Sequence, residues 1–114
     1  RFDKAEKHLL VAAQLDKRAL ADLAKLYART QQTPKANAYA EQAIAHFQGL
    51  VDADPDNLEN RFMLADQFVV LKRFQDAINL LEEGIKLNRD PRINKKVSQI
   101  LLEAMQDIPT DEFE

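Results

Sequence analysis

The chain has 114 residues, of which 46% are hydrophobic and 31% are charged, and this composition excludes intrinsic disorder as a description of the whole. The net charge of −3, with both signs interspersed, excludes the basic footprint of a nucleic-acid or anionic-membrane binder. The lack of cysteine excludes disulfides and thiolate metal sites, but it leaves the compartment of a soluble protein open between the cytoplasm and a bacterial periplasm. No apolar run approaches the ~20 residues that a membrane-spanning helix needs.

Apolar residues recur at three- and four-residue steps along almost the whole chain, which predicts six helices and no strands. The first helix is expected from Phe2 to about Leu15, and Asp16 is expected to cap the second. The third is expected from Pro34 to about Ala53, with Thr33 as its N-cap. At a rise of 1.5 Å per residue, this third helix would be about 30 Å long, longer than its neighbours.

Turn residues separate the remaining three helices. The segment Asp54-Pro55-Asp56-Asn57 predicts a break, after which Asn57 is placed to cap the fourth helix. The fifth is expected from Phe74 to Leu87, and the sixth from Asp90-Pro91 to Pro109. We therefore expect a helical domain over residues 1–107 and an acidic, solvated tail over 108–114.

Two helical patterns occur twice in the chain. The pattern of the first helix returns 72 residues later, where Phe2, Ala5 and Leu9 match Phe74, Ala77 and Leu81. The pattern Leu20-x2-Leu23-Ala24-x2-Tyr27 returns as Arg61-x2-Leu64-Ala65-x2-Phe68, 41 residues later. Internal repetition of this kind is typical of stacked repeat folds, which mostly present surfaces for binding.

These residues resemble the tetratricopeptide repeat family, whose consensus has a bulky residue, Leu-Gly and Tyr on its first helix and Ala and an aromatic residue on its second. The resemblance implies an all-α, right-handed solenoid of antiparallel helical hairpins with about six helices. Arg61 departs from the family pattern, because it occupies a position that is usually bulky and apolar. The 41 residues from Leu23 to Leu64 also exceed the family period of ~34.

The first helix resembles the second helix of a repeat without its first, so we expect the chain to start inside a repeat. Either further repeats precede Arg1 in a longer protein, or a second copy of the chain covers the open face.

No arrangement of side chains predicts catalysis, a metal site or a cofactor. His8 and His46 stand alone on different helices, and neither has a second histidine at the spacing that a zinc site needs. Ser98 lacks the glycine-flanked turn of a hydrolase nucleophile, and the two glycines cannot form a phosphate-binding loop. The sequence therefore predicts a protein that is not an enzyme.

The resemblance implies a concave groove lined by the first helix of each hairpin. On this register the expected partner-binding residues are Lys25, Arg29, Phe62, Asp66, Val69, Leu102 and Met105. The alternative for Phe62, Val69 and Met105 is packing against neighbouring helices. Asp66 stands where a carboxylate clamp would have a neutral amide, so the expected ligand is an apolar peptide with an acidic portion facing Lys25 and Arg29.

The leading functional hypothesis is a non-enzymatic scaffold or adaptor that binds a protein or peptide, and neither nucleic acid nor a membrane interior. One alternative is a regulatory or substrate-recruiting domain of an enzyme whose catalytic part lies outside this sequence. Another is a self-associating assembly unit, with a homodimer formed through exposed terminal helices.

Overall fold

A computed structural model of the protein describes residues 2–106 and places them in six α-helices without a strand. The helices are α1 (Phe2–Leu15), α2 (Ala19–Arg29), α3 (Thr33–Ala53), α4 (Leu58–Val70), α5 (Phe74–Leu87) and α6 (Pro91–Gln106). The bounds of α1 and α5 agree with the sequence prediction, and α3, at 21 residues, is the longest helix as expected. The predicted helix end at Pro109 and the predicted tail over 108–114 lie outside the described residues.

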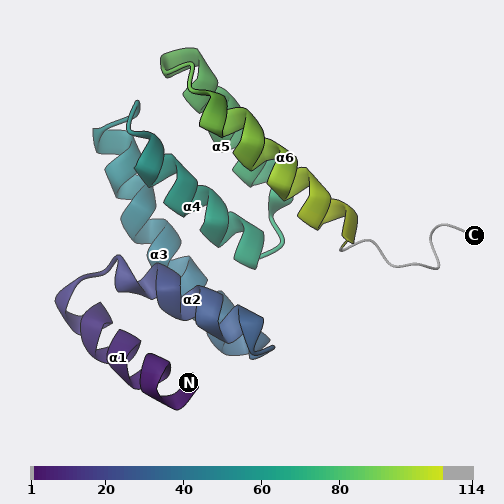
Figure 1. The fold of residues 1–114 in the computed structure, drawn as a ribbon. Helices are drawn as coiled ribbons and strands as arrows, with labels where there is room; N and C mark the ends of the chain where they lie inside the picture. Colours follow the sequence, from purple (N-terminus) through teal and green to yellow (C-terminus); the bar gives the residue numbers. More distant parts are fainter. Residues whose placement is uncertain (1, 107–114) are drawn as a thin grey trace, which may run out of the picture.

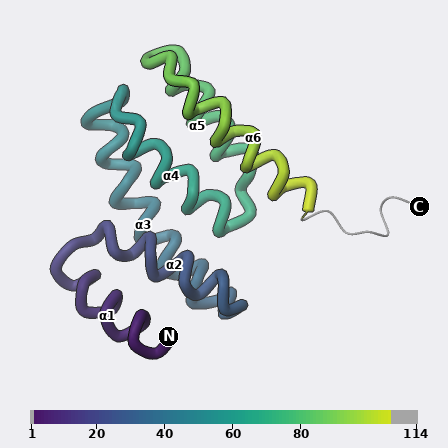
Figure 2. The backbone as a smooth tube through the Cα atoms, in the orientation of Figure 1, coloured from purple at the N-terminus to yellow at the C-terminus, as the bar shows by residue number. Residues whose placement is uncertain are grey.

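The helices stack as successive antiparallel hairpins, as short connections between helices require (Figure 1). Each helix contacts the next one in the chain, and α2 also contacts α4. The first helices of two consecutive hairpins, α2 and α4, therefore lie side by side. The tube in Figure 2 follows the same path, with α1 and α6 at opposite ends of the stack. This arrangement confirms the predicted all-α solenoid.

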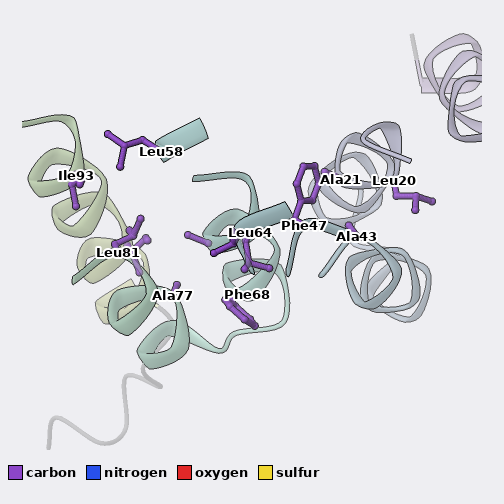
Figure 3. Packing of buried hydrophobic residues seen from close by; sticks show 13 residues of the cluster. Leu20, Ala21, Ala43, Phe47, Leu58, Leu64, Phe68, Ala77, Leu81 and Ile93 are labelled. Atoms are coloured by element: carbon purple, nitrogen blue, oxygen red, sulfur yellow. The ribbon is translucent and has the colours of Figure 1, made fainter. Parts of the chain in front are cut away.

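The hydrophobic core extends along the stack. One cluster joins buried residues of α2 through α6, and Figure 3 shows Phe47 of α3 between Ala21 of α2 and Leu64 of α4. Phe47 is 1% exposed, and Ala21 and Leu64 are fully buried. Small residues at these crossings let the helix axes approach, while the larger side chains fill the remaining space. Burying a leucine such as Leu64 contributes about 1.5–3 kcal/mol to folding.

Tyr27 anchors α1, a helix that buries none of its own residues. Its hydroxyl donates a hydrogen bond to Glu6 at 2.7 Å, and its ring makes an edge-type contact with the Phe2 ring and stacks on Tyr39. Burial, together with the hydrogen bond to Glu6, raises the pKa of Tyr27 to about 12. The phenol therefore stays protonated, and able to donate to Glu6, at neutral pH.

The N-cap predicted at Thr33 was wrong. Thr33 is the first residue of α3, Gln32 occupies the N-cap without a side-chain hydrogen bond, and Pro34 follows within the first turn. The helix begins one residue early because the carbonyl of Gln32 already accepts the N–H of Ala36. At the start of α4 the prediction is confirmed, since the Asn57 side chain accepts the N–H of Asn60.

The connection from α1 to α2 also differs from the expected cap. Asp16 accepts the N–H of Arg18 at 2.9 Å, but α2 begins only at Ala19, with Arg18 as its N-cap. The N–H groups of Ala19 and Leu20 bond to carbonyls three residues back, which is the pattern of a 3₁₀ turn. Asp16 therefore stabilises the turn that leads into the helix.

The first helices of the two hairpins end in the same way. The N–H of Gln32 bonds to the carbonyl of Tyr27, and the N–H of Gln31 bonds to that of Ala28. The equivalent bonds after α4 run from Arg73 to Phe68 and from Lys72 to Val69. Both ends are Schellman motifs, in which the residue after the C-cap adopts a positive φ. Gln31 has a φ of 60° and Lys72 a φ of 63°, so neither position uses the glycine that this conformation favours.

We expect Gln31→Gly to raise the free energy of unfolding by about 1 kcal/mol. The left-handed conformation costs a residue with a side chain roughly 1–2 kcal/mol, and glycine avoids this cost. Chemical denaturation of the two proteins measures the difference. The matched control Gln42→Gly, in the exposed part of α3, should instead lose about 1 kcal/mol, because glycine disfavours a helix interior. A loss of stability in both variants would contradict the prediction.

Candidate functional site

Four of the predicted site residues line one open cavity. Lys25 and Arg29 of α2 and Asp66 and Val69 of α4 surround a space of about 560 Å³. Its lining is completed by Leu9, Asp22, Ala28, Val70 and Glu103. The cavity lies where α2 and α4 are neighbours, with α1 contributing Leu9 at one side and α6 contributing Glu103 at another. We call this cavity, together with the smaller cavity that continues it, the α2–α4 groove.

A smaller cavity of about 260 Å³ continues the groove toward the start of α3. It shares Ala28, Val69, Val70 and Glu103 with the larger cavity. Its other lining residues are Gln31, Thr33, Ala36, Asn37 and Lys72. The shared residues provide an apolar floor with one carboxylate at its edge.

Asp66 ties three helices together at the groove. Its carboxylate accepts a hydrogen bond from the Lys25 ammonium at 2.9 Å and pairs through its other oxygen with Lys96 of α6. The Asp66 side chain is 20% exposed, so water screens these pairs less than it screens surface ion pairs. The network fixes α2, α4 and α6 relative to one another, and it leaves Lys25 already bound to a carboxylate.

The structure places Phe62, Leu102 and Met105 outside this cavity lining. Phe62 is half-buried against the main core cluster, and the guanidinium of Arg92 lies 5.8 Å from its ring centroid. Leu102 is 59% exposed and Met105 is 63% exposed on α6. The part that these three residues, and the four that line the cavity, play in binding stays a prediction.

Sequence reasoning did not place Glu103 or Lys96 of α6 at the groove. They are seven residues apart, which places them on the same face of a helix. Lys96 pairs with Asp66, and Glu103 lines the groove, so this face of α6 is the one turned toward α4. Looking in the sixth helix of the sequence for a cation able to pair with Asp66 would have identified the face that carries Lys96 and Glu103.

Within residues 2–106, no group of three or more metal-binding side chains comes together. In the same part of the chain, no helix has the length and apolar character needed to cross a membrane. The residues that line the groove offer apolar contact, from Ala28, Val69 and Val70, and ion pairing, from Arg29 and Glu103.

Two hairpins with matched ends and paired first helices are the architecture of a helical repeat. A family model described as tetratricopeptide repeat matches residues 37–100, which is more than half of the chain. The chain belongs to the tetratricopeptide repeat family. A comparison with curated proteins gives no match.

The repeat architecture assigns four of the helices to two hairpins, and the family match begins after α2. The pairs α2–α3 and α4–α5 form two hairpins, and the matched residues begin in α3 and end in α6. Tetratricopeptide repeats generally mediate protein–protein interactions and are generally non-catalytic. In this tetratricopeptide repeat chain the groove is formed by α2 and α4, the first helices of the two hairpins.

Proposed function

We propose that this chain is a non-enzymatic protein–protein interaction module that binds a segment of a partner protein in the α2–α4 groove. The observation that carries the proposal is the groove itself, which combines an apolar floor of Ala28, Val69 and Val70 with charged residues at its edge. A preformed surface of this kind binds with little ordering of the backbone. A net charge of −3 favours a protein partner over a nucleic acid.

Selection of peptides from a displayed random library on the whole chain tests the proposal. Val69→Asp places a charge on the apolar floor and should weaken the selected peptides at least about tenfold, because the new carboxylate loses water when the peptide covers it. The matched control is Val11→Asp, at a valine that is 60% exposed on α1 and does not line the groove. Circular dichroism verifies that both variants remain helical. Peptides that bind both variants equally well would remove the groove as the binding site.

Recruitment by an enzyme domain outside this sequence would use the same groove, with the partner segment acting as the recruited substrate. Neighbouring sequence with a catalytic signature would favour this second role. The comparison of Val69→Asp with Val11→Asp tests binding in the groove for an adaptor and for a recruiting domain alike.

Self-association is the other candidate, and exposed apolar residues at the two ends of the stack favour it. Leu101, Leu102 and Met105 are exposed on α6, and Val11 and Leu15 on α1. Patches of this kind often mark contacts with another protein. Sedimentation of the chain over a range of concentrations tests it, and a monomer at every concentration would exclude the homodimer.

A further inference from the structure

We propose that the α2–α4 groove selects a partner segment that carries both charges. An acidic side chain would meet Arg29, apolar side chains would cover Ala28, Val69 and Val70, and a basic side chain would meet Glu103. This inference rests on the proposed function and specifies the chemistry of the partner.

The Lys25 ammonium can bind an acidic ligand only by giving up its ion pair with Asp66. It donates to Asp66 at 2.9 Å, and Asp66 also pairs with Lys96. A ligand carboxylate that binds Lys25 must therefore compete with a carboxylate that is held in place by two lysines. The proposal therefore assigns the acidic portion of the ligand to Arg29, and the expectation that Lys25 also takes part stays a prediction.

The remaining charged groups of the larger cavity form no ion pair within residues 2–106. They are one cation, Arg29, and two carboxylates, Asp22 and Glu103. Asp22 and Glu103 disfavour a segment that is only acidic, and the Arg29 guanidinium disfavours one that is only basic. A segment with both signs satisfies each group, and an arginine also binds a carboxylate through well-oriented parallel hydrogen bonds.

The position of Glu103 relates the charges to the apolar floor. Glu103 borders both cavities together with Ala28, Val69 and Val70, whereas Arg29 borders the larger cavity only. Arg29 and Glu103 form no ion pair with each other in the described residues, so a segment lying along the floor would meet them with different side chains. We expect apolar residues between its acidic and basic positions.

Charge reversal on the whole chain tests this inference with peptides from the displayed random library. Peptides selected on the unaltered chain should carry an acidic and a basic residue separated by apolar ones. Arg29→Glu and Glu103→Lys should each weaken such a peptide about tenfold, since a lost charged hydrogen bond is replaced by repulsion. Exchanging the matching charge in the peptide should restore binding to each variant.

The control variants are Arg89→Glu and Glu82→Lys, which make the same charge changes at exposed positions outside the groove lining. They should leave the affinity unchanged.

Three outcomes would overturn the inference. In the first, the selected peptides carry no charge pattern, and their affinity falls with Val69→Asp but not with Arg29→Glu or Glu103→Lys. The proposed function would then remain intact. A library that yields no peptide sensitive to Val69→Asp would remove both. A dimer of the unaltered chain that Val69→Asp dissociates would show that a second copy fills the groove.

Discussion

Replacing Arg61 with alanine is expected to lower the free energy of unfolding by about 3 kcal/mol. Arg61 is 4% exposed and stands at the position where the preceding hairpin has Leu20. Its Nε donates to the carbonyl of Pro55 at 2.7 Å, and its terminal nitrogen donates to that of Leu80 at 2.9 Å. The arginine thereby joins the turn before α4 to the middle of α5. Alanine would remove both donors and leave a cavity between the helices.

Gly84 leaves room for the Arg61 side chain. A Cβ atom added at Gly84 would lie 3.0 Å from the Cδ of Arg61, which is closer than side chains normally approach. The long arginine stem therefore crosses α5 at a residue without a side chain, and it fills the space that an apolar residue fills in the other hairpin.

Two further variants separate volume from hydrogen bonding at Arg61. Arg61→Met keeps most of the volume and removes the donors, so it should lose about 1 kcal/mol. Arg89→Ala, at an exposed arginine, should change stability by no more than about 0.5 kcal/mol. Denaturant titration of the three variants gives the values. The account of Arg61 would be wrong if Arg61→Ala and Arg89→Ala had the same small effect.

Replacing Gln67 with leucine is expected to raise the free energy of unfolding by about 2 kcal/mol. Gln67 is fully buried in α4, and neither its Oε1 nor its Nε2 has a hydrogen-bond partner in the part of the chain that the structure describes. Burying an unsatisfied amide costs roughly 1–3 kcal/mol. The equivalent position of α2, 41 residues earlier, is Leu26, which is also buried. Leucine has a side chain of similar size, so the surrounding packing should accept it.

Gln99→Leu is the matched control, because Gln99 is exposed on α6 and loses no buried polar group. It should change stability by about 0.5 kcal/mol or less. Thermal unfolding followed by circular dichroism compares the two variants. A Gln67→Leu protein less stable than the unaltered chain would show that the buried amide is satisfied in solution.

The helices could be predicted from the sequence because their signals are local. Each signal determines the structure of only a few neighbouring residues. Examples are the periodic apolar residues of α1 and α5 and the helix-breaking segment Asp54-Pro55-Asp56-Asn57. The prediction of Thr33 as an N-cap was wrong because the start of α3 depends on the preceding turn, which the sequence does not signal. The Schellman turn after α2 determines where Gln32 lies, and this turn depends on a positive φ at Gln31 that glutamine does not signal.

The groove could be predicted only in part. The repeat register brought Lys25, Arg29, Asp66 and Val69 to one cavity, because equivalent helices turn equivalent faces to the same side. The face that α6 turns toward α4 depends on the pairing of Lys96 with Asp66, an interaction across 30 residues of sequence. Within residues 2–106 Arg29 and Glu103 form no ion pair, and this too depends on tertiary contacts, which no local pattern encodes.

The most direct test of the account is to map where a peptide selected by the chain binds, by following the backbone amide signals of the whole protein in NMR titrations. If the peptide binds in the groove, the largest shift changes occur at Lys25, Ala28, Arg29, Val69 and Val70, with little change at exposed residues of α3 and α5 such as Glu41 and Glu82. Shift changes confined to α3 and α5, with the α2 and α4 signals unmoved, would contradict it.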